Sequence, residues 1–417
     1  MRSIASRLRP FRIVATVRYF LHLRRDSVRR RRREGLRIAV DATPLWGSVT
    51  GIGWYLHSLL EGLADREDVC LFLYGPMGEP PSVLPPTGPG LELVAFDVPE
   101  DLTLPPGMLR RVLRYLVPWF IAREAPDVVF APNFFPPRRF SLVRAPLVVT
   151  THDLASVHFS WTLEEATAQA LEKELKARLS SAARVVTPSA TVREEILEAG
   201  LASPEKVVAV HHGPGHLRFA SSLDAEQSAD FRESLGLGRS FALGVGTLEP
   251  RKNLEVLLSA WRLGFERGET LPQLVLCGAR GWKDADLRAA CEAGLRAGWL
   301  VLPGYVDDDQ LQWLYREAKL VVQASLYEGF GLPLVEAMLA GRPLVCSDIP
   351  VFREVAQDAA LFVPAEAPES WLAAVLKVVD SSEGSALAAR AKVRAGEFDW
   401  RRCADETLAV LQAAAAS

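Results

Sequence analysis

Two glutamates enclose a glycine-rich stretch in the last third of the chain, EGFGLPLVE at residues 328–336. Pro333 suits the first position of a helix, and the two glycines before it let backbone N–H groups turn towards an anion at the helix N-terminus. Glu328 is then expected in the loop and Glu336 about one turn into the helix. Two carboxylates on one side suit bidentate recognition of sugar hydroxyls. The alternative is a capped amphipathic helix with two exposed glutamates.

A second charged segment is GTLEPRKN at residues 246–253, which follows an apolar run and precedes the helical pattern LEVLLSAWRL. Asn253 is a typical helix N-cap, so Arg251 and Lys252 flank a helix start, where two cations and N–H groups can neutralise a diphosphate. A leaving diphosphate gains charge as its bond to carbon breaks, so these cations would stabilise the transition state and replace a metal. The alternative is a solvated Arg-Lys pair in a turn.

Two motifs in the first half of the chain carry weaker signals. His152 closes the apolar run PLVVTTHD, and a histidine at the carboxyl end of a strand either contacts a sugar hydroxyl, carries a proton, or is an ordinary turn residue. Gly51 and Gly53 lie in the loop TGIGWY after the first apolar run, although a lone G-x-G is also a common turn.

Other patterns are better explained without a cofactor. The D-x-D pattern at residues 307–309 directly precedes the helical stretch DQLQWLYREA, which predicts an N-cap with acids in the first turn. His211, His212 and His216 occur without a nearby carboxylate or cysteine partner, so we expect no metal site. An NAD-dependent enzyme is disfavoured because no G-x-G-x-x-G opens a helix with an acidic residue about 20 positions later.

The composition is that of a folded protein of two or three domains. The 417 residues are 49% hydrophobic and 24% charged, which excludes extensive disorder and a multispan membrane protein. Five scattered cysteines without a C-x-x-C pair indicate neither a disulfide framework nor a zinc knuckle. We therefore expect a protein of the reducing cytoplasm.

The charge is concentrated in an N-terminal arm, residues 1–35. The arm has twelve arginines against Asp26 and Glu34, which gives it a net charge of +10. Because the whole chain has a net charge of −3, the rest of the chain carries −13. Its apolar part, FRIVATVRYFLHL, is too short and too charged to span a bilayer. We favour a helix lying on an anionic, inner-membrane surface. A solvated extension remains open, whereas the acidic remainder argues against nucleic acid.

The elements that must position these residues follow a repeated pattern of buried strands and helices. Near-continuous apolar runs alternate with helical patterns such as 54–63, 109–122 and 163–179, which indicates parallel sheets covered on both faces. The first series of predicted strands is 36–42, 69–75, 91–98, 127–132, 146–153, 183–189 and 206–213. The second series is 240–246, 271–278, 298–306, 318–325, 342–348 and 359–364.

The predicted fold is α/β, with two facing Rossmann-like domains and a cleft between them. We assign residues 36–219 to an acceptor domain, 220–395 to a donor domain and 396–417 to a terminal helix that returns to the first domain. Ligands of such sheets bind outside the carboxyl ends of the strands, where the motifs above are found.

These motifs together resemble those of the retaining glycosyltransferase family four, also called group one, whose members have the GT-B fold. EGFGLPLVE resembles the family's E-x7-E motif and GTLEPRKN its diphosphate-binding loop. GYVDDDQLQWLYREAKLVVQASLYEGFGLPLVEAM and the later SDIPVFREV are collinear with the family's carboxyl-terminal domain. The resemblance covers about residues 36–417.

The resemblance implies a role for each motif. Glu336 would bind the nucleotide ribose, and Arg251 and Lys252 the diphosphate, while Glu328 would contact the donor sugar and His152 would face it. The remaining donor-binding residues would form three groups. Gly51 and Gly53 of the TGIGWY loop would lie beneath the phosphate, and the backbone of Phe330, Gly331 and Leu332 would contact the sugar and its phosphate. Gly304, Tyr305 and Val306 would line the base pocket.

The resemblance also implies a reaction. We expect a metal-independent, retaining transfer of a hexosyl unit, with mannosyl and GDP-mannose favoured and UDP-glucose or dTDP-rhamnose open. The acceptor would be a glycan or a polyprenyl-linked glycan, and the departing phosphate would accept its proton. The alternative function is a non-catalytic nucleotide-sugar-binding scaffold at the membrane.

Overall fold

A computed structural model describes residues 35–417 except 48, 76–80, 95–120, 122–123, 135–142, 161–164, 216, 218–222, 239 and 279–284. The predicted basic arm and most of the helical pattern at 109–122 therefore lie outside the described residues. The described residues form two compact units. Unit 1 contains those up to Thr150 together with Ala177–Val185 and Ala404–Ser417, and unit 2 contains Thr151–Lys176 and Val186–Cys403. The boundary that we placed between residues 219 and 220 stays a prediction.

The first sheet has seven strands in the order β3-β2-β1-β4-β5-β6-β7, and the registers of its first five strands are parallel. The inner strand β1 leads through the short 3-10 helix η1 into α2. The strands β1, β2, β4 and β5 end in buried residues because both faces of the sheet are covered. The strands are β1 (Leu36–Asp41), β2 (Val69–Tyr74), β3 (Leu91–Val94), β4 (Val128–Ala131), β5 (Leu147–Thr150), β6 (Arg184–Thr187) and β7 (Val207–Ala209). The helices are η1 (Thr43–Leu45), α2 (Gly51–Ala64), α4 (Ala155–His158), α5 (Glu165–Ser181) and α6 (Ala190–Glu198).

The second sheet has six parallel strands in the order β10-β9-β8-β11-β12-β13. Its strands are β8 (Phe241–Val245), β9 (Gln273–Cys277), β10 (Leu300–Gly304), β11 (Leu320–Gln323), β12 (Leu344–Ser347) and β13 (Leu361–Val363). The helices around it are α7 (Ala225–Ser234), α8 (Leu254–Glu266), α9 (Ala285–Ala297), α10 (Asp308–Glu317), α11 (Leu332–Leu339), α12 (Pro350–Ala356), α13 (Pro368–Val378) and α14 (Ser382–Ala395). The 3-10 helices η4 (Pro250–Lys252) and η5 (Gln357–Ala359) and the terminal α15 (Trp400–Ala415) complete the described elements.

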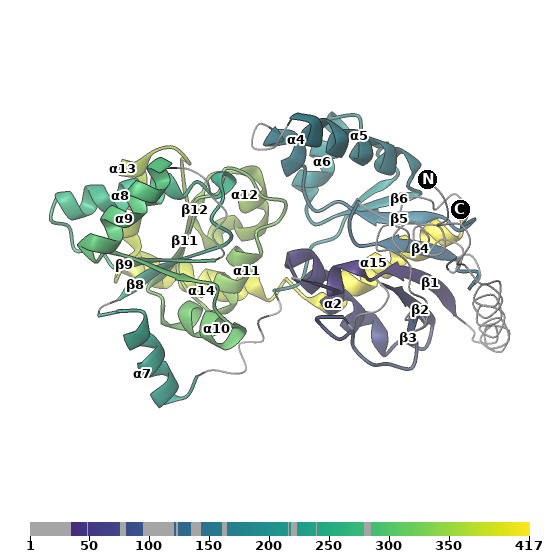
Figure 1. Ribbon diagram of the computed structural model, residues 1–417, viewed down its shortest axis with the longest axis horizontal. Helices are drawn as coiled ribbons and strands as arrows, with labels where there is room; N and C mark the ends of the chain where they lie inside the picture. Colours follow the sequence, from purple (N-terminus) through teal and green to yellow (C-terminus); the bar gives the residue numbers. More distant parts are fainter. Residues whose placement is uncertain are drawn as a thin grey trace, which may run out of the picture. The chain divides into compact units, whose positions relative to one another are not determined.

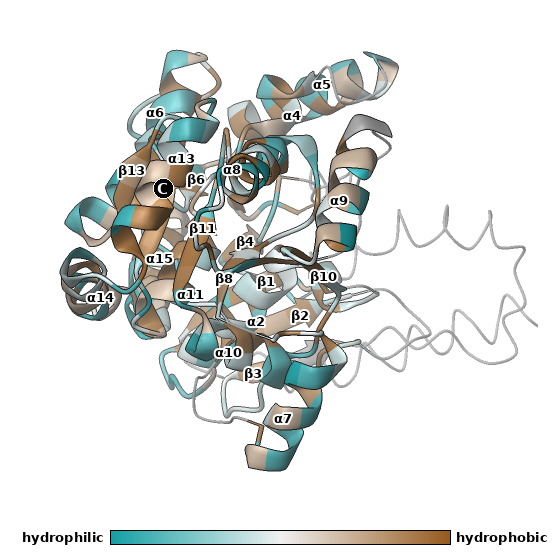
Figure 2. Ribbon diagram, turned by 90° about the vertical axis from the view of Figure 1, so that its left-hand side faces the viewer, coloured by the Kyte–Doolittle hydropathy of each residue, from teal (hydrophilic) through white to brown (hydrophobic). Residues whose placement is uncertain are grey.

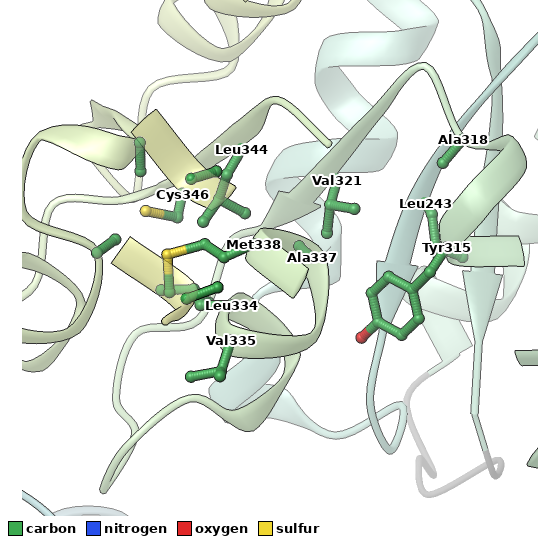
Figure 3. Close-up of a cluster of buried hydrophobic side chains, with 14 of the residues drawn as sticks. Leu243, Tyr315, Ala318, Val321, Leu334, Val335, Ala337, Met338, Leu344 and Cys346 are labelled. Atoms are coloured by element: carbon green, nitrogen blue, oxygen red, sulfur yellow. The ribbon is translucent and has the colours of Figure 1, made fainter. Parts of the chain in front are cut away.

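The core of this second sheet consists of two apolar layers, one on each face. Neighbouring residues of a strand enter opposite layers, so Leu243 and Val321 pack with α11, whereas Ala242 and Val322 pack with the layer that contains Trp261 of α8. Figure 1 shows α8, α9 and α13 on one side of the sheet and α10, α11 and α14 on the other. Figure 3 shows Met338 and its neighbours on α11 within the layer that also contains Leu243 and Val321.

The predicted architecture of two α/β layered sheets is confirmed, and the predicted strand and helix runs that fall on described residues are confirmed to within a few positions. In Figure 2 the strands of the second sheet are mainly hydrophobic, whereas hydrophilic residues gather on helices such as α7 and α10. Within the described part of the chain, no helix combines the length and the apolar character that crossing a membrane requires.

Candidate active site

The centre of the candidate site is the carboxylate of Glu328, which is only 7% exposed. Its Oε1 accepts hydrogen bonds from the Lys252 ammonium and, at 2.8 Å, from the Ser325 hydroxyl. Its Oε2 accepts a hydrogen bond from Nη1 of Arg251 at 2.8 Å. The structure therefore brings the two motifs together that the sequence separates by more than seventy positions.

Strand pairing explains why these two loops meet. β8 and β11 are hydrogen-bonded neighbours, and Arg251 follows β8 while Glu328 follows β11, so both loops leave the same edge of the sheet. The amide of Leu326 donates to the carbonyl of Arg251 at 2.8 Å and fixes one loop against the other. Gly246 adopts a φ of +144°, and a Cβ there would lie 3.2 Å from Cε of Lys252. A glycine is thus needed beneath the lysine stem.

The electrostatics of the cluster are balanced. Burial alone would raise the pKa of the Glu328 carboxyl, but the charges of Lys252 and Arg251 and the hydrogen bonds hold that pKa below its usual value. Burial alone would lower the pKa of the Arg251 guanidinium, but the negative charges of Glu328 and Glu249 outweigh burial and raise that pKa above its usual value. Arg251 also pairs with Glu249 at 2.5 Å, so two cations face two carboxylates. An incoming anion can therefore replace Glu328 as the partner of Arg251 and Lys252, so that neither cation is left without a negative charge beside it.

The backbone after Glu328 is shaped by two glycines. Gly331 is the N-cap of α11 with a φ of +95°, and Pro333 occupies the second helical position, one later than we predicted. A Cβ on Gly329 would lie 1.8 Å from the carbonyl oxygen of His152, and Ser189 donates to the carbonyl of Gly329 at 2.7 Å. Only glycine fits this contact, and it places His152 beside the glycine-rich loop.

His152 follows the end of β5 in coil and lies within a group of rings. Its centroid is 5.4 Å from that of His212, which is stacked on Trp400 at 5.8 Å and lies 5.2 Å from Phe330. Burial, with the nearby His152 and His211, lowers the pKa of His212 well below its usual value. A neutral His212 thus packs as an aromatic wall against His152.

Glu336 lies within α11 and is 6% exposed. Its Oε2 accepts a hydrogen bond of 2.7 Å from the hydroxyl of Tyr315, which is fully buried on α10. Gly215 packs against the same carboxylate, because a Cβ there would lie 2.1 Å from Oε1 of Glu336. The orientation of this carboxylate is therefore fixed by a helix that lies outside its own motif.

The remaining predicted donor-binding residues lie at two other places. Gly304 ends β10 and accepts a hydrogen bond from the amide of Gly278 at 3.0 Å, while the next residue, Tyr305, is 85% exposed and Val306 is buried. Gly51 and Gly53, which we predicted in a loop, instead form part of the first turn of α2 in unit 1, and a Cβ on Gly53 would lie 2.5 Å from the carbonyl oxygen of Pro44. Residues 304–306 thus belong to the same unit as Glu328 but follow a different strand, and Gly51 and Gly53 belong to unit 1.

Two sequence predictions near the site need correction, and one is confirmed. Asn253 does occupy the N-cap position of α8, but its side chain donates to the carbonyl of Ala365 at 2.7 Å instead of capping the helix. His211 has a carboxylate partner after all, because its Nε2 lies 2.7 Å from Oε1 of Glu354. Asp307 caps α10 through a capping box with Gln310, as predicted. His216 lies outside the described residues, and no metal-binding group of three or more ligands occurs among those described.

Ser325 and Tyr315 were missed by the sequence interpretation. A serine three residues before Glu328 is a weak local signal, since a short loop can turn its hydroxyl back onto the carboxylate. Tyr315 is 21 residues before Glu336 on another helix, so no spacing rule identifies it.

Comparison with known proteins gives the family. Residues 50–213 match the family described as Glycosyl transferase 4-like domain, and residues 227–395 match Glycosyl transferases group 1. The chain is 32% identical over 391 residues to O-antigen chain mannosyltransferase B of Escherichia coli, covering 89% of this chain and 98% of that protein.

Solved structures give the same architecture. Sucrose-phosphate synthase (tll1590) of Thermosynechococcus elongatus is similar with a TM-score of 0.70 at 20% identity, covering 92% of this chain and 100% of that one. Anabaena Alr3699/HepE, solved in complex with UDP-glucose, is similar with a TM-score of 0.66 at 17% identity, covering 91% and 100%. The two parallel sheets, the shared motifs and these relatives together show that the chain is a glycosyltransferase of family four, the group 1 glycosyltransferases of GT-B fold.

Proposed function

We propose that this glycosyltransferase moves a mannosyl unit from GDP-mannose to a glycan or a polyprenyl-linked glycan. The name of the Escherichia coli relative, a mannosyltransferase of O-antigen chains, supports both the mannosyl unit and a glycan acceptor. The UDP-glucose complex of HepE supports a nucleotide-diphosphate sugar as the class of donor.

The observation that carries the proposal is the cluster of Arg251, Lys252 and Glu328 beside the start of α11. In the proposed complex the donor diphosphate takes the two cations, and backbone amides from Phe330 to Leu332 add donors at the helix N-terminus. Glu328, released from the ion pairs, accepts hydrogen bonds from the sugar hydroxyls. The cations act most strongly on the departing diphosphate, whose charge increases in the transition state.

The roles proposed for the other predicted residues follow the family resemblance. Glu336, held by Tyr315, binds the ribose hydroxyls, and residues 304–306 contact the base. His152 contacts a hydroxyl of the donor sugar, and the loop of Gly51 and Gly53 contacts the donor phosphate.

Retention and metal independence are parts of the same proposal. The acceptor hydroxyl forms its bond to the anomeric carbon on the same face on which the bond to the diphosphate breaks, so the sugar keeps its anomeric configuration without a carboxylate nucleophile. The departing phosphate oxygen accepts the proton of the acceptor hydroxyl. Side-chain cations neutralise the diphosphate, so we expect activity to survive EDTA. Loss of activity in EDTA, restored by one divalent metal, would contradict this part.

A thermal-shift panel followed by a transfer assay tests the proposal. We expect GDP to raise the melting temperature more than UDP or dTDP, and GDP-mannose to be consumed when a mannose-terminated oligosaccharide is added. The Arg251→Ala, Lys252→Ala double variant should lose transfer. Nucleotide binding without donor consumption for any tested acceptor would favour the scaffold alternative.

We also propose that the arginine-rich residues 1–35 attach the enzyme to the anionic inner face of the cytoplasmic membrane. The support is their charge and apolar spacing in the sequence. Flotation with vesicles containing anionic lipid should be lost when residues 1–35 are deleted. Equal flotation of both proteins would exclude the arm as the anchor.

A further inference from the structure

Asp41 is the last residue of β1 and has no part in the site described above. β1 lies between β2 and β4, so the chain builds the sheet outwards in opposite directions from this point. In open α/β sheets, ligands bind at the carboxyl ends of the strands where the strand order reverses. Asp41 is therefore the carboxylate that the first sheet places at its own ligand-binding edge.

The two oxygens of Asp41 have different surroundings. Oδ1 accepts hydrogen bonds from the amide of Thr43 at 3.1 Å and from its hydroxyl at 2.5 Å. Oδ2 accepts none from the residues that the structure describes, although Asp41 is only 8% exposed. Burial raises the pKa of this carboxyl, while the Thr43 hydrogen bonds oppose the rise. Thr43 thus holds Oδ1 in place, whereas Oδ2 is available to accept a hydrogen bond from a ligand.

The backbone around Asp41 is held firmly. The amide of Ala42 donates to the carbonyl of Tyr74 at 2.7 Å, and the amide of Leu45 donates to the carbonyl of Ala42 at 3.0 Å. On the same edge of the sheet, Thr150 at the end of β5 is satisfied by the hydroxyl of Tyr55 at 3.2 Å. Asp41 differs from this polar pair because none of the described residues donates a hydrogen bond to its Oδ2.

A purely structural role does not require an aspartate here. An asparagine keeps Oδ1 and both hydrogen bonds from Thr43 without the cost of burying a charge. Buried ionisable groups with altered pKa values at ligand-binding edges are characteristic of functional sites. The chemistry of Oδ2 fits a hydroxyl donor, because a carboxylate oxygen accepts but does not donate.

We propose that Oδ2 of Asp41 binds a hydroxyl group of the sugar acceptor and so selects and orients the acceptor in unit 1. This rests on the proposed function in one respect, that the acceptor is a glycan. A hydrogen bond between a hydroxyl and a buried carboxylate is among the stronger kind, so its loss should reduce binding about 10- to 100-fold.

Two variants separate the oxygens of Asp41. Asp41→Asn keeps the Oδ1 contacts and replaces the Oδ2 acceptor by an N–H donor. Thr43→Val removes the hydroxyl bond to Oδ1, leaves Oδ2 unchanged and lies on an exposed residue. The assay uses the full chain, GDP-mannose and a mannose-terminated oligosaccharide, with kcat and both KM values measured. Melting temperatures with and without GDP report folding and donor binding.

We expect Asp41→Asn to raise the acceptor KM or lower the acceptor kcat/KM about 10- to 100-fold. The donor KM and the rise in melting temperature caused by GDP should stay unchanged. Thr43→Val should stay within about threefold of the wild type for both substrates, since the carboxylate remains in place. An Asp41→Asn enzyme with wild-type acceptor kcat/KM overturns the proposal, and so does an equal loss of donor binding. If the wild type does not use GDP-mannose, the donor assignment fails separately, and the same comparison is made with the nucleotide sugar that turns over.

Discussion

The pairing of Lys252 with Glu328 allows its structural and chemical roles to be separated by a double-mutant cycle. Lys252→Met removes the cation with little change in length, and Glu328→Gln removes the anion while keeping its shape. Lys252 is 8% exposed and Glu328 is 7% exposed, so each single variant takes one oppositely charged partner away from a buried charge. Breaking a buried ion pair in this way costs about 3–5 kcal/mol.

The contacts in the structure refine this magnitude. Glu328 keeps Arg251 and Ser325, each at 2.8 Å, when Lys252 is removed, so we expect the lower end, about 3 kcal/mol, for Lys252→Met. Glu328→Gln removes the carboxylate partner of the buried Lys252, whereas Arg251 keeps Glu249 at 2.5 Å, so we expect a larger loss, about 4 kcal/mol. The double variant removes one charge of each sign and should cost only about 1 kcal/mol. The cycle should therefore be non-additive by several kcal/mol.

The assay pairs urea unfolding midpoints with single-turnover transfer. Stability should recover in the double variant, whereas turnover should remain about 10² to 10³ below the wild type, because the cation that faces the diphosphate is still absent. If turnover returned together with stability, Lys252 would serve the fold alone and the reasoning about the diphosphate would be refuted.

Three further predictions concern the surroundings of this cluster. Glu336→Gln should weaken GDP binding about 10-fold or more, and Tyr315→Phe should do so by a smaller factor; calorimetric titration checks both, and equal wild-type affinities would contradict the ribose assignment. Gly329→Ala should lower the melting temperature and the yield of folded protein, because its Cβ would lie 1.8 Å from the carbonyl oxygen of His152. The Glu354 carboxyl is half-buried, yet hydrogen bonds from His211 and the start of α6 lower its pKa to about 2, so its contribution to stability is present above its unfolded pKa of about 4.3 and is lost as the pH falls towards 2. Urea midpoints measured from pH 6 to pH 2 should therefore fall less for Glu354→Gln than for the wild type.

The sequence predicted more of the fold than of the site. Apolar runs with a strand's length and alternating helical patterns were enough for the two parallel sheets, because burial on both faces leaves a continuous signal. The cap at Asp307 was also predictable, because its partner Gln310 is only three residues away. The partner of His211 was not, because Glu354 is 143 residues away and only packing brings α12 to the start of α6.

By itself, the sequence determined which residues carry charge and where each motif starts and ends, since capping, turn formation and strand burial depend on near neighbours. The tertiary structure decided which charges meet: Lys252 with Glu328 through the pairing of β8 and β11, and Tyr315 with Glu336 across two helices. It also decided that Asp41 is buried, because burial of a side chain depends on atoms brought together by folding and not on sequence spacing.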